Sequence, residues 1–193
     1  MNTTLRLLAV LLAGLPAAAM AADTTAVDRN VKQQERIEQG LQSGSLNTRE
    51  AARLERQQAK IEQMEANASR DGQISSKEAA RIRHAQNAES ELIRSEKHDA
   101  QRGNPNSVSS QRMQADVARD INQQTRIRNG LADGSLTTHE AGRMERQQAS
   151  GDRKLARAGS DGYVGAGEQR RVVSADKRQS RHIWRQRHDA QHN

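Results

Sequence analysis

The sequence has no cysteine and no phenylalanine, and it holds one tryptophan, one tyrosine and two prolines. Without cysteine, disulfides, thiolate metal sites and cysteine nucleophiles are excluded. So few aromatic residues, with a mean hydropathy of −1.00, leave little apolar area to bury, and any core must be thin. The abundance of Ala, Gln, Glu, Arg and Lys is typical of long exposed helices. The same composition also fits a chain that is disordered when unbound.

Residues 1–22 have the pattern of a secretory signal peptide. An apolar run follows Arg6, and small residues precede a cleavage point near Ala21 or Ala22. This run is too short to span a membrane, and later segments are too polar to do so. We therefore expect a periplasmic or secreted protein with no transmembrane segment.

Two long segments of the chain are copies of each other. Residues 27–101 align with residues 117–191 at a constant offset of 90 without a gap, and close to half of the aligned pairs are identical. Between them, residues 102–116 contain Gly, Asn, Pro and a serine cluster, which predicts a flexible linker. The expected organisation is a first unit at 23–101 and a second unit at 117–193.

A turn pattern, Gly-x-aliphatic-(Asn/Ser/Thr)-x-x-Glu, occurs twice in each copy. It is centred on Gly44, Gly72 and Gly134, and in altered form on Gly162. The polar residue after the aliphatic one is an N-cap, and the Glu three residues later completes a capping box. Each copy is therefore predicted to be helix, turn, helix, turn, helix, and the fold all-α. In the second copy Gly151 replaces Ile61, which predicts a broken or frayed helix there.

These paired turns, with glycine at loop position six, an aliphatic residue at eight and glutamate at twelve, resemble the EF-hand family. The resemblance implies that the aliphatic residues of a pair lie side by side in a two-stranded ladder. The expected pairs are Leu46 with Ile74 and Leu136 with Val164. It also implies a calcium site in one loop, with ligands from Asn67, Ser69, Asp71, Gln73, Ser75 and Glu78.

The expected calcium affinity of this loop is low. Only Asp71 and Glu78 bring charge, so the dissociation constant should be on the order of 10⁻⁴ to 10⁻³ M. The other loops place leucine at the third position, or Arg157 at the first, and are poorer sites. The alternative is that all four turns are purely structural, because capping boxes need no metal.

Histidines are the other candidate site residues. His98–Asp99 and His188–Asp189 are sequence neighbours, and neighbours on a helix point about 100° apart, so neither is a catalytic pair. His188 and His192 are four residues apart and could share a transition-metal ion near the chain end. Nucleophile elbows, phosphate loops and metalloprotease helices are absent from the sequence, and we expect a protein that is not an enzyme.

The two copies differ in charge. The first is neutral overall, whereas the second carries a net charge of +6. A basic helical face favours anionic partners. Nucleic acid is not an expected partner, because export removes the usual target and Tyr163 and Trp184 are the only aromatic side chains available for stacking.

Two functions follow from these patterns. The leading hypothesis is an exported helical repeat protein that binds calcium or another divalent cation weakly, or has a structural role, through degenerate EF-hand-like loops. The alternative is a basic periplasmic chaperone or stress protein that binds unfolded clients or anionic envelope components through its second copy. The turn at Leu46, Thr48 and Glu50 is faintly similar to the Leu-Thr-x-x-Gln motif of the Spy and CpxP periplasmic chaperones.

Overall fold

The computed structural model describes residues 17–188, with side chains from Thr24 onward. This part of the chain is all-α, as predicted, and contains no strand. Its helices are α1 (Ala17–Ser43), α2 (Thr48–Ala68), the 3₁₀ turn η1 (Ser69–Asp71), α3 (Ser76–His98), α4 (Val108–Ala132), α5 (Thr138–Ala158) and α6 (Ala166–Gln186). Of the predicted signal peptide, residues 1–16 lie outside the described residues.

The predicted turns are present in both copies. Each has its glycine in the left-handed region, with φ of +74° at Gly44, +85° at Gly72, +76° at Gly134 and +93° at Gly162. Three of the helices that follow begin with a complete capping box. The capping pairs are Asn47 with Glu50, Ser75 with Glu78, and Thr137 with Glu140. The local sequence therefore determines where these helices begin.

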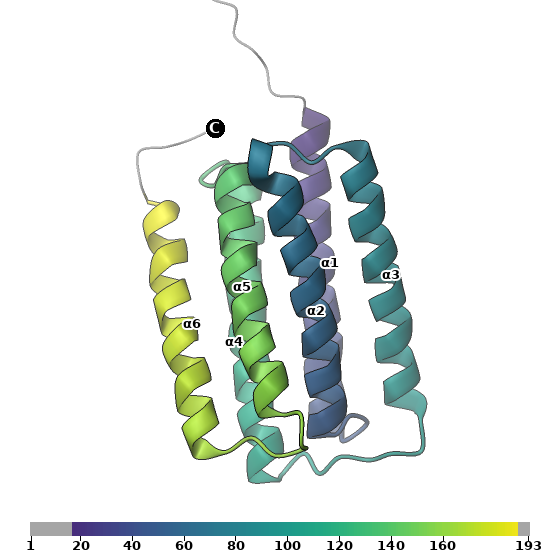
Figure 1. The fold of residues 1–193 in the computed structure, drawn as a ribbon. Helices are drawn as coiled ribbons and strands as arrows, with labels where there is room; N and C mark the ends of the chain where they lie inside the picture. Colours follow the sequence, from purple (N-terminus) through teal and green to yellow (C-terminus); the bar gives the residue numbers. More distant parts are fainter. Residues whose placement is uncertain (1–16, 189–193) are drawn as a thin grey trace, which may run out of the picture.

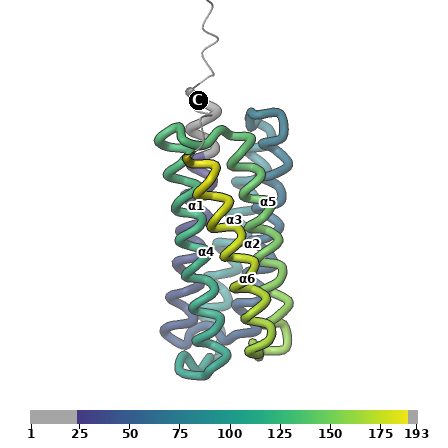
Figure 2. Tube along the Cα trace, turned by 90° about the vertical axis from the view of Figure 1, so that its left-hand side faces the viewer, coloured from purple at the N-terminus to yellow at the C-terminus, as the bar shows by residue number. Residues whose placement is uncertain are grey.

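Six helices run up and down, each antiparallel to the next, and form three layers (Figure 1). The middle layer is a four-helix core of α1, α2, α4 and α5, in which α2 packs on α5 and α1 packs on α4. Helix α3 covers α1 and α2, and α6 covers α4 and α5 on the opposite side. Figure 2 shows α4 and α6 running side by side. The core is thus built jointly by the two copies.

Helices α2 and α5 approach each other closely because small residues face each other near both ends. A Cβ on Gly142 would lie 2.5 Å from the Cβ of Ser69. At the other end, a Cβ on Gly159 would lie 3.0 Å from the Cβ of Ala52. These contacts exchange under the 90-residue offset, since Ala52 corresponds to Gly142 and Ser69 to Gly159. The molecule therefore has an approximate two-fold axis that passes between α2 and α5.

Two expectations about chain continuity are corrected. Helix α5 is not broken at Gly151, which is buried inside a continuous helix; packing against α2 outweighs a glycine cost of about 1 kcal/mol. The connection between the copies is shorter than predicted, because Ser107 caps α4 and residues 108–116 are helical. It also lies against the first turn, where the Gly103 N–H donates to the carbonyl of Gly44 at 2.9 Å.

The ladder expected from the EF-hand resemblance does not form. Leu46 lies between α1 and α2, whereas Ile74 lies between α2 and α3 at the opposite end of the bundle (Figure 1). Leu46 instead shares an apolar cluster with Val164 of the other copy. Leu136 lies in a separate cluster at the other end. An up-and-down helical path places successive turns at opposite ends, so they cannot pair.

Apolar side chains gather at the two ends of the four-helix core. One cluster, near the α1–α2 turn, includes Leu46, Leu54, Met113, Leu155 and Val164. The second, near the α4–α5 turn, includes Val27, Ile127, Leu136, Met144 and Ile183. The part of the core between these two clusters is polar, and it contains the candidate site.

Candidate metal centre

Polar side chains point inward from all four core helices, midway between the apolar ends. Helices α2 and α5 contribute the same spacing, with an acid, a glutamine three residues later and another acid four residues after that. The residues are Glu55, Gln58 and Glu62 on α2, Glu145, Gln148 and Asp152 on α5, Asn30 and Gln34 on α1, and Asp120 and Gln124 on α4; all are buried. Such a set in the middle of a core is unusual, because buried polar groups cost free energy unless they are paired.

Three of these carboxylates meet. Glu55, Asp120 and Asp152 come from α2, α4 and α5, and each offers one oxygen such that the three oxygens lie within 4.8 Å of one another. We call this group the carboxylate centre. Glu55 and Asp152 are completely buried and Asp120 is 3 % exposed. An oxygen triangle of this size can close around a divalent cation, whose bonds to oxygen are about 2.0 to 2.6 Å long.

Hydrogen bonds satisfy the carboxylate centre only in part. Gln34 Nε2 donates to Glu55 Oε2 at 3.1 Å, and Gln148 Nε2 makes a long contact of 3.4 Å to Asp120 Oδ1. Within the described chain, Glu55 Oε1 accepts no hydrogen bond, and Asp152 is hydrogen-bonded to another buried acid, the Glu62 carboxyl. The centre therefore keeps lone pairs that a cation could fill.

The approximate two-fold axis gives the centre a counterpart made from Glu145, Glu62 and Asn30. Here Gln124 Nε2 donates to Glu62 Oε1 at 2.7 Å and to Glu145 Oε2 at 3.1 Å. Asn30 replaces the third acid, and its Nδ2 donates to Glu65 Oε2 at 2.8 Å. The counterpart therefore has one carboxylate fewer than the carboxylate centre and more hydrogen-bond donors. Of the two groups, the carboxylate centre is better suited to bind a cation.

Burial controls the protonation of these acids. Desolvation raises the pKa of Glu55 and of Glu145 to about 7, although glutamine donors act against it. Desolvation, followed by the charges of neighbouring carboxylates, raises the pKa of Asp120 well above its ordinary value. The pKa of Asp152 is likewise raised well above its ordinary value by burial first and by Glu55 next. Negative charge in the centre is therefore disfavoured as long as nothing balances it.

Basic side chains do not supply that balance. Among the side chains that the structure describes, no lysine, arginine or histidine is buried. Arg119 attracts Asp120, but it is paired with Asp176 (Nε to Oδ2, 3.0 Å) and with Asp116. The charge of the centre must then be neutralised by protons or by a bound cation. With only carboxylate and amide oxygens available, the chemistry suits hard cations such as Mn²⁺, Mg²⁺ or Ca²⁺.

The loop predicted to bind calcium uses its polar groups locally. Asn67 lies in the last turn of α2, where its Oδ1 accepts from Gln63 Nε2 at 3.3 Å. Ser69 is buried, and its Oγ donates to the Glu65 carbonyl at 2.6 Å. Asp71 Oδ1 accepts the backbone N–H of Gln73 at 3.1 Å.

The two remaining predicted ligands form the cap of α3. Glu78 Oε2 accepts from the backbone N–H of Ser75 at 3.0 Å and from its hydroxyl at 2.6 Å. These are the bonds of a capping box, and they occupy the carboxylate that calcium would need. The side chains of Asn67, Ser69, Asp71, Ser75 and Glu78 thus all make local contacts within the turn and the adjoining end of α2, and calcium binding there stays a prediction.

A second acidic group is already compensated. Glu50, Glu96 and Asp99 also place three oxygens within 4.8 Å of one another. Glu50, however, caps α2 by accepting the Asn47 N–H at 2.9 Å, and Glu96 binds Arg53 Nη2 at 3.2 Å. This group therefore has a structural explanation that the carboxylate centre lacks.

The histidines form no site among the described residues. His98 Nδ1 contacts the Arg94 carbonyl at 2.7 Å rather than Asp99. His188 Nδ1 contacts the Trp184 carbonyl at 2.7 Å, and its ring stacks on Trp184 at a centroid distance of 4.6 Å. The predicted partner of His188, His192, lies outside the described residues.

The carboxylate centre was not among the sites predicted from the sequence. Glu55 and Glu145 stand in identical Glu-Arg-Gln-Gln-Ala segments, which look like exposed helix surface in a chain with 28 % charged residues. One signal was present: Glu, Gln and an acid recur at the same spacing in both copies, and the first Glu directly follows the apolar Leu54 or Met144. Which acids would meet depends on how the copies pack, and that cannot be read from the periodicity.

Comparison with known proteins identifies no relative of this chain. No protein-family model, curated protein or solved structure matches the chain. In the described part of the chain, no helix is both long and apolar enough to cross a membrane. The site itself is therefore the basis for inferring a function.

Proposed function

We propose that this protein binds a hard divalent cation inside its four-helix core, at Glu55, Asp120 and Asp152. The observation that carries the proposal is the meeting of three buried carboxylate oxygens within 4.8 Å, in a group where Glu55 Oε1 has no donor and Asp152 is hydrogen-bonded only to a further acid, Glu62. The proposal keeps the divalent cation that the sequence indicated but moves its site from the Asn67–Glu78 loop to the core.

Electrostatics supports this choice of ligand. Uncompensated burial of even one carboxylate costs several kcal/mol, and neighbouring carboxylates add repulsion. A divalent cation removes both penalties at once. Because ligands must be deprotonated to bind metal, the cation competes with protons, and its affinity should fall as the pH drops below about 7. Binding to the folded state alone also stabilises the fold, in proportion to the logarithm of the cation concentration.

Metal titration of the purified protein, first stripped with a chelator, tests the proposal. At pH 7.5 we expect one tight Mn²⁺ site, counted by the loss of the free-ion electron paramagnetic resonance signal, with Ca²⁺ and Mg²⁺ competing in calorimetry. Asp152→Asn removes a ligand charge at nearly constant shape and should weaken Mn²⁺ binding by at least about 100-fold. Helicity measured by circular dichroism checks that the variant is folded.

The matched control is Glu78→Gln, which makes the same acid-to-amide change in the loop. It should leave Mn²⁺ affinity within about two-fold of the unmodified protein. Loss of binding in Glu78→Gln but not in Asp152→Asn would transfer the site to the loop and refute the core site. Absence of any cation binding up to millimolar concentration, in a folded protein, would refute both sites and leave the acids neutralised by protons.

A further inference from the structure

A groove of about 700 Å³ lies between α5 and α6, and none of the three acids of the carboxylate centre lines it. We call it the basic groove, because five cationic side chains line it and Glu168 is its only acid: the cations are Lys154, Arg157, Arg170, Arg171 and Arg178. The Glu168 carboxylate already accepts the Gly165 N–H at 2.9 Å. The groove therefore has a large excess of positive charge.

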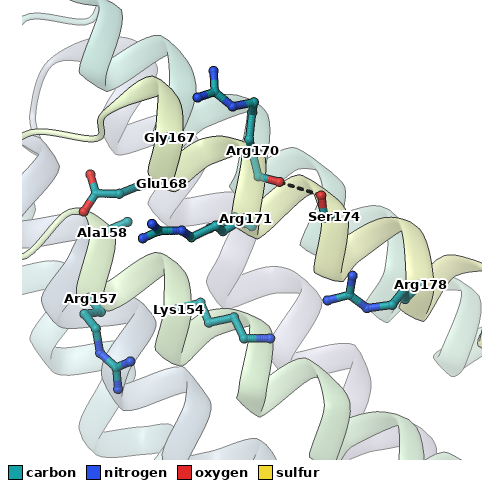
Figure 3. Close-up of a pocket in the computed structure, with 10 residues that line it drawn as sticks. Lys154, Arg157, Ala158, Gly167, Glu168, Arg170, Arg171, Ser174 and Arg178 are labelled. Carbon is teal, nitrogen blue, oxygen red and sulfur yellow. Dashed lines mark hydrogen bonds between the residues drawn. The ribbon is translucent and has the colours of Figure 1, made fainter.

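The geometry points to a binding site for a small, multiply phosphorylated anion in the basic groove. Figure 3 shows Arg178 and Lys154 reaching toward each other from α6 and α5, while Arg171 extends toward the end of α5. Among the described residues, the side chains of Arg171 and Arg178 have no carboxylate within ion-pair distance. Lys154 has a longer-range attraction to Asp176. Arg157 and Arg170 point away from this pair of cations in Figure 3. The convergent cations are therefore Lys154 and Arg178, with Arg171 beside them. Guanidinium and ammonium groups placed in this way are the chemistry that recognises phosphate.

Comparison of the two copies indicates that this charge is specific to one face. Under the 90-residue offset, four of the five cations correspond to uncharged residues in the first copy: Lys154 to Met64, Arg157 to Asn67, Arg170 to Ala80 and Arg178 to Ala88. Only Arg171 has a basic counterpart, Arg81. The same helix–turn–helix backbone thus exists without the charge, so the fold does not require these cations.

Size and shape narrow the class of ligand. A groove of about 700 Å³ is within the range of sites for drug-sized ligands and exceeds what a single phosphate would fill. No aromatic side chain lines it, so there is no surface on which a nucleic-acid base would stack. Recognition would then go through the phosphate groups. The first turn of α6 also lines the groove with Gly167, and the positive end of the helix dipole adds to the attraction.

Calorimetry with tripolyphosphate as the probe tests the site on metal-free protein, so that the probe does not act through a bound cation. At physiological salt we expect one-to-one binding. The double variant Lys154→Met, Arg178→Ala restores the residues of the first copy and should reduce the affinity at least ten-fold. The matched control is Lys77→Ala, Arg81→Ala, which removes two cations from the corresponding face of the first copy, and it should stay within about two-fold.

A second arm distinguishes the source of the phosphate. Vesicles containing phosphatidic acid present the same group as a lipid headgroup. If the groove variant loses affinity for either probe while the control does not, the site is supported, and the probe affected identifies its source. The inference is wrong if both variants weaken binding of the probes equally, or if neither variant does. It is also wrong if both variants lose binding to a single-stranded oligonucleotide in parallel. In each case the attraction is general to the basic surface.

Discussion

The middle and the ends of the four-helix core are built from opposite kinds of residue. At the ends, Leu54 and Ile127 are completely buried in apolar clusters. In the middle, Glu55, Asp120 and Asp152 are buried to nearly the same degree but lack counter-charges. The same four helices, packed on the same partners, form both regions. Only the chemistry of the inward positions differs.

This difference distinguishes the residues that stabilise the fold from the buried acids that oppose it. The apolar ends and the close α2–α5 contact at Gly142 are sufficient reasons for the helices to associate. The buried acids oppose that association at neutral pH, since each is desolvated. A sequence that places destabilising groups where apolar ones would pack is expected to do so at a functional site.

The largest expected effect is a loss of stability of the metal-free protein as the pH rises. Glu55 and Glu145 have a folded-state pKa of about 7 against an ordinary value of 4.5. Below pH 4.5 both glutamates are protonated in the folded and in the unfolded state, and their contribution to the free energy of unfolding is fully present. Between pH 4.5 and 7 the unfolded state releases its protons first, so the free energy of unfolding falls. Each group contributes on the order of 3 kcal/mol to this fall.

Urea denaturation across this pH range measures that fall. Glu55→Gln should flatten the curve because it removes one of the titrating acids of the core, and saturating Mn²⁺ should recover stability at pH 7.5. A metal-free protein whose stability rises steadily from pH 4.5 to 7 would show that the middle of the core is not desolvated as described.

A change at the apolar end should be smaller and independent of pH. Ile127→Ala removes a completely buried side chain and should cost about 3 kcal/mol through lost burial and an unfilled cavity. The same loss should be measured by urea denaturation at pH 5 and pH 7.5, and with or without Mn²⁺. A cost that changes with pH or metal would mean that the ends and the middle do not act separately.

The smallest expected effect has the opposite sign. Glu89 on α3 is completely buried beside the centre, and neither of its carboxylate oxygens has a donor. Burial, followed by the charge of Glu55, raises its pKa well above its ordinary value. Glu89→Met keeps a similar volume, and at pH 7.5 it should stabilise the metal-free protein by about 1 to 2 kcal/mol, measured by thermal and urea unfolding.

Its matched control is Gln179→Met at the corresponding position of α6. Gln179 donates to Gln148 in the core, so its replacement removes a buried hydrogen bond and should destabilise the protein instead. If Glu89→Met is the more destabilising of the two, the buried carboxylate has a partner that supports the fold.

The helices were predictable from sequence because local signals set their limits. The left-handed glycine at Gly72 and the cap at Ser75 mark the start of α3 without tertiary information. The predicted break at Gly151 was wrong because burial against another helix outweighs intrinsic propensity. The site was not predictable, because Glu55 and Asp152 are 97 residues apart and meet only through the packing of one copy on the other.

The close contacts at Gly142 and Gly159 also determine how the molecule would respond to a cut in the chain. The two copies pack most closely where α2 lies on α5. Proteolytic cleavage within residues 99–107 should therefore leave the two copies associated as a stable pair. Neither half, prepared separately, would have a partner for its exposed face. In this respect the two copies associate as the subunits of a heterodimer do, although they belong to one polypeptide.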